Sequence, residues 1–203
     1  MFTDERVEVA LNSVDRADFT RIDPYCDVPQ SIGFGATISA PHMHAYALDK
    51  LVTAIKPASH ILDVGSGSGY LAACLAKMVG EKGKVVGVEH IEELVDLSIR
   101  NVRKHNADLL DSGRLVLVAG DGRRGYPDAA PYDAIHVGAA ARELPQTLVD
   151  QLAVGGRMVI PVEFSYGQEF IQVDKISPNE VRQTKIVPVA YVPLTDRSAQ
   201  LNN

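Results

Sequence analysis

Three acidic residues and a glycine-rich turn are the parts of this sequence best suited to hold a small ligand. The acids are Asp63, Glu89 and Asp121, and each lies at or just after the end of a short apolar stretch. The turn reads Gly-Ser-Gly-Ser-Gly from Gly65 to Gly69. Closely spaced glycines let a ligand approach the backbone, and a helix that starts there offers free N–H groups. Carboxylates beside such a turn predict a ligand with hydroxyl or cationic groups.

The residues around the turn discriminate between nucleotide ligands. No Lys or Arg occurs between Ile61 and Ala76, so a pyrophosphate would have only backbone N–H groups to bind. The dinucleotide fingerprint places its third glycine three residues after the second, whereas Gly67 and Gly69 are two residues apart. S-adenosylmethionine carries a sulfonium, an α-ammonium and a ribose but no phosphate. We therefore expect this cofactor, with Glu89 accepting its ribose hydroxyls and S-adenosylhomocysteine as its product.

Hydrophobic periodicity predicts the elements that position these residues. A helix is expected over 4–18 with Thr3 as its N-cap, then a loop over 19–40 and a helix after Pro41. From residue 60 onward, strands and helices alternate. The expected strands are 60–64, 84–89, 115–119, 134–137 and 157–162, and the expected helices are 71–79, 91–105 and 144–152.

This alternation predicts an α/β fold with a doubly wound, mostly parallel sheet that helices cover on both faces. The architecture is Rossmann-like, as in class I S-adenosylmethionine-dependent methyltransferases. After Pro161 the pattern becomes β-rich, with runs at 170–176 and 181–191 separated by a turn, which predicts an antiparallel C-terminal hairpin at the sheet edge. No linker or repeat interrupts the chain, so residues 1–203 are expected to form a single methyltransferase domain.

Composition narrows the classes of function. The formal net charge is −6 and no run of Lys or Arg exceeds two residues, which disfavours a nucleic-acid partner. No stretch approaches the roughly eighteen apolar residues of a membrane span, and the N-terminus lacks the apolar core of a signal peptide. Cys26 and Cys74 have no metal-type spacing, and His42 and His44 would face different ways on a helix. We expect a cytoplasmic (cytosolic) protein with no metal site.

Longer motifs extend over nearly the whole chain. They are Gln30–Gly33, Ala36–Leu48, Ile61–Gly69, Gly120–Arg123, Ala130–Ala141 and Tyr191–Asp196. Together they closely resemble the protein-L-isoaspartate (D-aspartate) O-methyltransferase family. The stretch Ser-Ala-Pro-His-Met-His that begins at Ser39 is similar to the eukaryotic branch of that family.

The resemblance implies a reaction, a substrate and a partner class. Family members transfer a methyl group from S-adenosylmethionine to the free α-carboxylate of L-isoaspartyl residues, with D-aspartyl residues as a second candidate. The ester then recyclises, which initiates repair of the damaged protein or peptide. A carboxylate has a pKa of about 3.5 to 4, so it is ionised at neutral pH and needs no general base. Because an open groove suits varied isoaspartyl-containing proteins, we expect a monomer.

The resemblance also implies roles for individual residues. Ser39 matches the family's active-site serine and is expected to orient the substrate carboxylate without acting as a nucleophile. The residues expected to bind or surround the cofactor are Ala36, Thr37, Ile38, Ser39, His44, Asp63, Gly65, Gly67, Glu89, His90, Asp121, Gly122, Thr195 and Gln200. The segment that starts at Tyr191 is expected beside the substrate peptide.

Structural interpretations of the same residues stay open beside these roles. The glycines could form only a tight turn and the acids only strand-end caps. Thr37 or Ser39 could cap the helix that follows Pro41, and His136 is expected to be a hydrogen-bonded core residue. Arg123 and its neighbour favour a solvated turn over a substrate clamp.

Other functions and two departures from the family pattern also bear on the interpretation. The alternatives are a methyltransferase for a small molecule or nucleic acid, a regulatory module that binds the cofactor without catalysis, and a dinucleotide oxidoreductase. The family normally has a further helix before Thr3, whose absence would affect cofactor affinity. It also has a Gly-Pro and Gly-Gly turn where this chain has the bulkier Glu163–Gln168, which would reshape the rim of the substrate groove.

Overall fold

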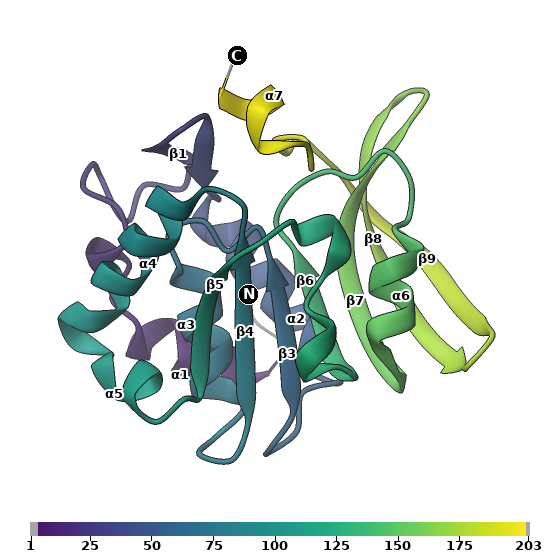
Figure 1. Ribbon diagram of the computed structural model, residues 1–203, viewed down its shortest axis with the longest axis horizontal. Helices are drawn as coiled ribbons and strands as arrows, with labels where there is room; N and C mark the ends of the chain where they lie inside the picture. Colours follow the sequence, from purple (N-terminus) through teal and green to yellow (C-terminus); the bar gives the residue numbers. More distant parts are fainter. Residues whose placement is uncertain (1–3, 202–203) are drawn as a thin grey trace.

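A seven-stranded sheet forms the centre of the protein (Figure 1), as seen in a computed structural model that describes residues 4–201. Its strand order is β5-β4-β3-β6-β7-β8-β9. The first five of these strands are parallel, and β8 and β9 are added antiparallel to β7. The strands are β3 (His60–Val64), β4 (Lys84–Glu89), β5 (Leu115–Ala119), β6 (Tyr132–Val137), β7 (Leu152–Phe164), β8 (Gly167–Ser177) and β9 (Glu180–Val189). The predicted α/β class, mostly parallel sheet and C-terminal antiparallel hairpin are confirmed.

The helices follow the predicted order with three differences. The helices are α1 (Glu5–Ser13), α2 (Pro41–Leu51), α3 (Tyr70–Met78), α4 (Glu92–His105), α5 (Ala107–Asp111), α6 (Gln146–Gln151) and α7 (Arg197–Leu201). The first helix ends at Ser13, because Val14 is extended, and a 3₁₀ turn at Arg16–Asp18 follows. Its N-cap is Asp4, whose carboxylate accepts from the Arg6 backbone N–H at 2.9 Å, whereas Thr3 lies outside the described residues. The short helices α5 and α7 were not predicted.

Residues 19–40 contain structure where the glycines and prolines predicted only a loop. Gln30–Gly33 (β1) and Ala36–Ile38 (β2) form an antiparallel hairpin, with Phe34 and Gly35 at its turn. Both turn residues have positive φ, 55° and 69°. Strands of three and four residues are too short to show a hydrophobic period, which is why the pattern missed them.

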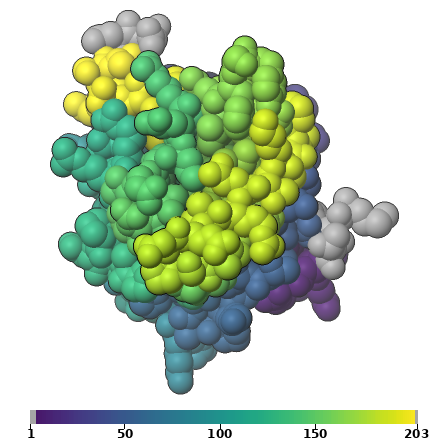
Figure 2. All heavy atoms as spheres, turned by 90° about the vertical axis from the view of Figure 1, so that its right-hand side faces the viewer, coloured from purple at the N-terminus to yellow at the C-terminus, as the bar shows by residue number. Residues whose placement is uncertain are grey.

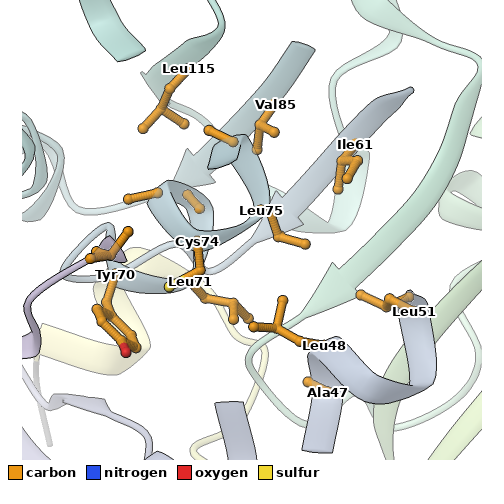
Figure 3. Close-up of a cluster of buried hydrophobic side chains, with 14 of the residues drawn as sticks. Ala47, Leu48, Leu51, Ile61, Tyr70, Leu71, Cys74, Leu75, Val85 and Leu115 are labelled. Carbon is orange, nitrogen blue, oxygen red and sulfur yellow. The ribbon is translucent and has the colours of Figure 1, made fainter. Parts of the chain in front are cut away.

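Two apolar layers lie on opposite faces of the sheet. On one face α2, α3 and α4 pack against the strands and α1 packs on α2 and α3; Figure 3 shows Leu48 of α2 beside Leu71 of α3. On the other face Leu148 and other apolar residues of α6 pack on β6 and β7. Most of these side chains are fully buried, and burial of each contributes about 1.5–3 kcal/mol. These layers hold the strand ends, and the residues that follow them, in fixed positions.

The hairpin of β8 and β9 forms the free edge of the sheet. Seen from that side, β9 crosses the face of the molecule (Figure 2), and most of its side chains are exposed or half-buried. The chain then leaves β9 and returns across the carboxyl ends of the parallel strands as far as α7 (Figure 1). Within residues 4–201, no helix combines the length and apolar character that crossing a bilayer requires.

Gly69 offers a direct test of how the glycine-rich turn is packed. Its φ is +86°, and a Cβ built on it would lie 2.9 Å from the Ser98 Cβ, so Gly69→Ala introduces both strain and a clash. We expect it to lower the free energy of unfolding by about 2–5 kcal/mol. Gly113→Ala is the matched control, because its φ is +72° but nothing lies within 4 Å of the added Cβ. Thermal or urea unfolding measures both; equal losses would mean that α4 yields to the new methyl group.

Candidate active site

A cleft lies at the carboxyl ends of the parallel strands, over β3, β4 and β6. The strand order reverses there, since β4 and β5 lie on one side of β3 and β6 and β7 on the other. Open α/β sheets bind ligands at such a switch point. The cleft is lined by Ala36, Thr37, Gly65, Gly67, Val88, Glu89, His90, Asp121, Gly122, Gly138, Ala139, Val192, Pro193, Leu194, Thr195 and Gln200. None of these lining residues is a Lys or an Arg.

Asp63 lies beneath the cleft, paired with a histidine. Its Oδ1 lies 2.7 Å from Nδ1 of His136, which stands directly opposite it in the parallel register of β3 and β6. Both side chains are buried, and Oδ2 of Asp63 has no hydrogen-bond partner among the described residues. A buried carboxylate oxygen without a partner is costly. The prediction that His136 is a hydrogen-bonded core residue is therefore correct, and one oxygen of Asp63 lacks a donor among the described residues.

Glu89 joins the glycine-rich turn to the end of β4. Oε2 accepts from the Gly67 backbone N–H at 3.1 Å, and Oε1 accepts from that of Ile91 at 3.1 Å. Gly67 has a φ of +49°, and a Cβ there would lie 3.2 Å from Cδ1 of Ile32 in the β1–β2 hairpin. The carboxylate is thus held rigidly at the cleft wall, with lone pairs left for other donors.

Asp121 binds the turn after β5 to the C-terminal segment. Its carboxylate caps the following 3₁₀ turn and accepts from Nε of Arg123 at 2.9 Å. These hydrogen bonds from Arg123 hold the pKa of Asp121 below its usual value. The same guanidinium also bonds to Asp196. Arg123 is therefore more than a solvated residue of a turn, because it fastens residue 196 beside the cleft.

Gln200 closes the mouth of the cleft. Its Oε1 lies 2.8 Å from Nε2 of His90, and its Nε2 donates to the Phe34 carbonyl at 2.9 Å. The side chain thus joins the residue that follows β4 to the turn of the β1–β2 hairpin. The cleft has a volume of about 50 Å³, far below the roughly 300 Å³ of a small-ligand pocket. The C-terminal segment and the β1–β2 hairpin thus lie close over the strand ends.

Ser39 follows β2 and precedes α2. It is half-buried, and the N-cap of α2 is Ala40 without a side-chain hydrogen bond, so Ser39 does not cap the helix. Burial raises the pKa of the Tyr191 phenol to about 12, and a side-chain hydrogen bond with Ser39 opposes this rise. Gln168 holds Tyr191 in turn, accepting from its backbone N–H at 2.7 Å. The bulky turn after β7 is thereby linked to Ser39 through Tyr191.

His44 lies in the first turns of α2 and is buried. Its Nδ1 is 3.0 Å from Nη1 of Arg16, and its ring packs 5.0 Å from that of Tyr70. Burial, followed by the charge of Arg16, lowers its pKa well below the usual value. The ring is accordingly neutral at physiological pH. Neighbouring His42 faces away, where its Nδ1 lies 2.8 Å from the Asp27 carboxylate.

The structure brings most of the predicted cofactor residues to this one cleft. Those that line it are Ala36, Thr37, Gly65, Gly67, Glu89, His90, Asp121, Gly122, Thr195 and Gln200. Four predicted residues are not part of the lining: Asp63 and His44 are buried, Ser39 is half-buried, and the Ile38 side chain belongs to the core. A larger open groove of about 1320 Å³ between α1, α2 and β9 contains none of the predicted residues. The smaller cleft is therefore the candidate active site.

Comparison with known proteins agrees with this arrangement. The sequence pattern of the protein-L-isoaspartate(D-aspartate) O-methyltransferase (PCMT) family matches residues 1–199. The chain belongs to this family. It is 52% identical over 203 residues to a protein-L-isoaspartate O-methyltransferase of Caenorhabditis elegans, covering 100% of this chain and 90% of that protein. A wheat (Triticum aestivum) protein of the same name is 53% identical over 204 residues, covering 99% and 88%.

A solved structure extends the likeness to three dimensions. It is described as a beta-aspartate methyltransferase (PCMT) from Plasmodium falciparum in complex with S-adenosyl-L-homocysteine. The TM-score is 0.90 at 35% identity, covering 96% of this chain and 92% of that one. The predicted family and fold class are confirmed, and the fold is that of the class I S-adenosylmethionine-dependent methyltransferases.

Two residues of this methyltransferase site were not found by sequence reasoning. Arg16 contacts both His44 and the Ser39 backbone, although it precedes them by more than 20 positions. His136 was interpreted as a core residue and proves to be the partner of Asp63. A signal for His136 did exist, because a polar residue inside an apolar strand must find a partner, and Asp63 sits in the adjacent strand. Nothing local in the sequence marks Arg16.

Removing the Gln200 side chain should loosen this methyltransferase's hold on its cofactor. Gln200→Ala deletes the hydrogen bonds that join the C-terminal segment to His90 and to the Phe34 carbonyl, each contributing about 0.5–1.5 kcal/mol. We expect the affinity for S-adenosylhomocysteine to fall roughly tenfold, mainly through faster dissociation. Calorimetry and stopped-flow release measure both quantities. Gln183→Ala, at an exposed position on β9, is the control. Equal affinities of the two variants for S-adenosylhomocysteine would contradict the role of Gln200 in retaining the cofactor.

Proposed function

We propose that this protein transfers the methyl group of S-adenosylmethionine to the free α-carboxylate of L-isoaspartyl residues in damaged proteins and peptides. The main support is the cleft at the switch point of the sheet, whose lining contains carboxylates and a glycine-rich turn but no Lys or Arg. Family membership agrees with this activity. The product ester recyclises without further help from the enzyme, which begins repair of the damaged chain.

The residues of the cleft fit S-adenosylmethionine. The unpartnered, buried Oδ2 of Asp63 suits a donor such as an ammonium group. Glu89, with two backbone N–H groups already bound, keeps lone pairs for the ribose hydroxyls. The turn at Gly65 and Gly67 leaves the backbone open to close approach, since both have positive φ. Ala36, Thr37, His90, Asp121, Gly122, Thr195 and Gln200 would enclose the remainder.

When bound, the cofactor supplies an electrophilic methyl group attached to a sulfonium. The substrate carboxylate is already ionised at neutral pH, so the protein has no proton to remove from it. Ser39 orients that carboxylate through its hydroxyl, which holds the anion less tightly than a Lys or Arg would and leaves it nucleophilic. Tyr191 stays protonated at neutral pH because its pKa is about 12, and it fixes the Ser39 hydroxyl.

The proposal also includes the client proteins, the oligomeric state and the cellular compartment. Isoaspartyl sites must reach Ser39 on a flexible stretch of the client protein, so a monomer with an accessible rim is the expected form; light scattering that shows a stable dimer with the rim occluded would contradict it. Residues 1–203 act as one methyltransferase domain. The free thiols of Cys26 and Cys74 suit the cytosol, where disulfides are rare.

Methyl transfer to paired synthetic peptides tests the proposed function. One peptide contains isoaspartate and the other normal aspartate at the same position, and the cofactor carries a labelled methyl group. We expect base-labile label on the isoaspartyl peptide alone. Label on both peptides would contradict the proposed specificity for isoaspartate. Binding of S-adenosylhomocysteine without label on either peptide would preserve the cofactor site and overturn the proposed substrate.

A further inference from the structure

Arg16 is a buried arginine whose guanidinium spans two parts of the active site. It lies in the 3₁₀ turn after α1 and is 4% exposed. Nη1 is 3.0 Å from Nδ1 of His44, and Nη2 donates to the Ser39 carbonyl at 2.7 Å. The guanidinium carbon lies 5.3 Å from the centre of the Tyr70 ring, a favourable cation–π position. Two of its nitrogens are thus directed at Ser39, which the proposed function uses, and at His44, which the family motifs place at the active site.

The contact with His44 determines which nitrogen of that ring carries the proton. A guanidinium has only donors and stays protonated in proteins. Nδ1 of His44 must therefore accept the hydrogen bond from Arg16, so the neutral ring carries its proton on Nε2. The ring is also wedged against Tyr70, which limits its rotation. Arg16 thereby makes His44 a fixed donor at Nε2 and prevents the alternative tautomer.

The contact with Ser39 acts on the backbone that carries the active-site hydroxyl. Ser39 has hydrogen bonds on two sides, through its carbonyl to Arg16 and through its side chain to Tyr191. Ala40, the next residue, is the N-cap of α2 and has no side-chain hydrogen bond. The first turn of the helix is held by bonds to the Ala40 carbonyl and by the Asp27 carboxylate, which accepts from the His42 backbone N–H at 3.0 Å, whereas the Ser39 carbonyl before it is held by Arg16. Arg16 therefore links the residue that carries the active-site hydroxyl to the ring of His44, from a turn more than 20 positions earlier in the chain.

We propose that Arg16 is a positioning residue for methyl transfer, fixing the Ser39 backbone and holding His44 as its Nε2–H tautomer. The inference rests on the proposed function, which takes Ser39 to lie at the reaction centre, and on the family motifs that place His44 near it. Arg16 itself does not line the cofactor cleft. Its loss should therefore lower turnover far more than cofactor affinity.

The charged and titratable groups around His44 predict how its pKa should change when Arg16 is replaced. They are Arg16 from the turn after α1, Tyr70 from α3, His136 from the sheet and His42 from α2 itself. Behind them, Cys74 is hydrogen-bonded to Tyr70 and Asp63 to His136. Arg16 is the permanent positive charge in direct contact with the ring. Replacing it with a neutral residue should raise the pKa of His44, because protonation no longer places two cations side by side.

Two substitutions and a matched control test the proposal. Arg16→Met removes both the charge and the donors. Arg16→Lys keeps the charge but offers one nitrogen where the guanidinium offers two. Arg157→Met is the control, because Arg157 also bonds to a main-chain carbonyl and a side chain, those of Lys50 and Asp174, away from the cleft. For each variant we would measure kcat and KM on an isoaspartyl peptide, S-adenosylhomocysteine affinity, and the ¹⁵N spectrum of the histidine rings across pH.

The expected results are specific. In the unmodified protein the His44 signals should show a neutral ring protonated at Nε2. Arg16→Met should lower kcat on the order of 100-fold, change cofactor affinity less than about threefold, and raise the His44 pKa, whereas Arg16→Lys should lose less activity and leave that pKa low. Arg157→Met should keep the kcat of the unmodified protein.

Three results would overturn the proposal. They are an Nδ1–H tautomer of His44 in the unmodified protein, equal kcat values for Arg16→Met and Arg157→Met, or a cofactor affinity that falls as much as kcat. If Arg16→Met does not fold, the tautomer of the unmodified protein and the kcat of Arg16→Lys decide the question. Absence of methylation by the unmodified protein would instead reject the proposed function, while the ring spectra would still report on Arg16.

Discussion

Replacing Ser39 with alanine should lower kcat on the isoaspartyl peptide by about 100-fold or more, as expected when one hydrogen-bond donor at a reaction centre is removed. The affinity for S-adenosylhomocysteine should change less than about threefold. The physical reason is that the Ser39 hydroxyl is assigned to the substrate carboxylate, whereas the cofactor is enclosed by other residues of the cleft. Steady-state kinetics and calorimetry on the same preparation separate the two effects.

Two further variants make the Ser39 experiment specific. Ser31→Ala removes an exposed hydroxyl from the same β1–β2 hairpin and should leave kcat unchanged. Tyr191→Phe removes the phenol that bonds to Ser39 but leaves the serine in place, so a smaller loss is expected, roughly tenfold. If Ser39→Ala weakens cofactor binding as much as it slows turnover, the serine belongs to the cofactor site and its assignment to the substrate is wrong.

Replacing Asp63 with asparagine should lower cofactor affinity by about 100-fold or more. The change keeps the shape of the side chain but removes the charge from a buried group that has one oxygen free. Loss of one member of a buried, charged hydrogen-bonded contact costs about 2–5 kcal/mol. S-adenosylhomocysteine has the same α-ammonium as the cofactor, so calorimetry with this stable compound measures the effect directly.

The control for Asp63 is another aspartate that supports a strand. Asp133→Asn alters a carboxylate that accepts from the His60 backbone N–H at 2.9 Å, at the end of β3 opposite the cleft. We expect it to leave cofactor affinity unchanged within about twofold, because it lies outside the cleft lining. Equal losses for the two variants would mean that the effect of Asp63→Asn comes from a weakened sheet and not from a missing cofactor contact.

Local patterns in the sequence determined the fold class and the location of the site. The strand from His60 to Val64, the glycines after it and the periodic helices that follow depend on interactions between near neighbours, so their patterns could be interpreted without tertiary information. Acids at the ends of parallel strands necessarily meet at one edge of the sheet, which is why Glu89 and Asp121 were both placed at the cleft. The short β1–β2 hairpin was not predicted, because its strands have too few residues to show a hydrophobic periodicity.

The resemblance to known methyltransferases supplied what local patterns could not. Ser39, His44, Thr195 and Gln200 have no local feature that marks them, and only the family motifs pointed to them. The structure places Gln200 against His90, a residue 110 positions earlier, and Thr195 in the cleft lining. It also shows that the Ile38 side chain belongs to the core, a distinction that the motif alone did not make.

Only the tertiary structure decided how the site residues are held. The register of β3 and β6 sets His136 opposite Asp63, and packing of the turn after α1 brings Arg16 to His44 and to the Ser39 carbonyl. Such contacts join residues far apart in the chain, and their formation depends on how whole elements pack and on where a long side chain can reach. The propensities of neighbouring residues can be interpreted directly from the sequence, whereas contacts between residues far apart in the chain follow only from the complete fold.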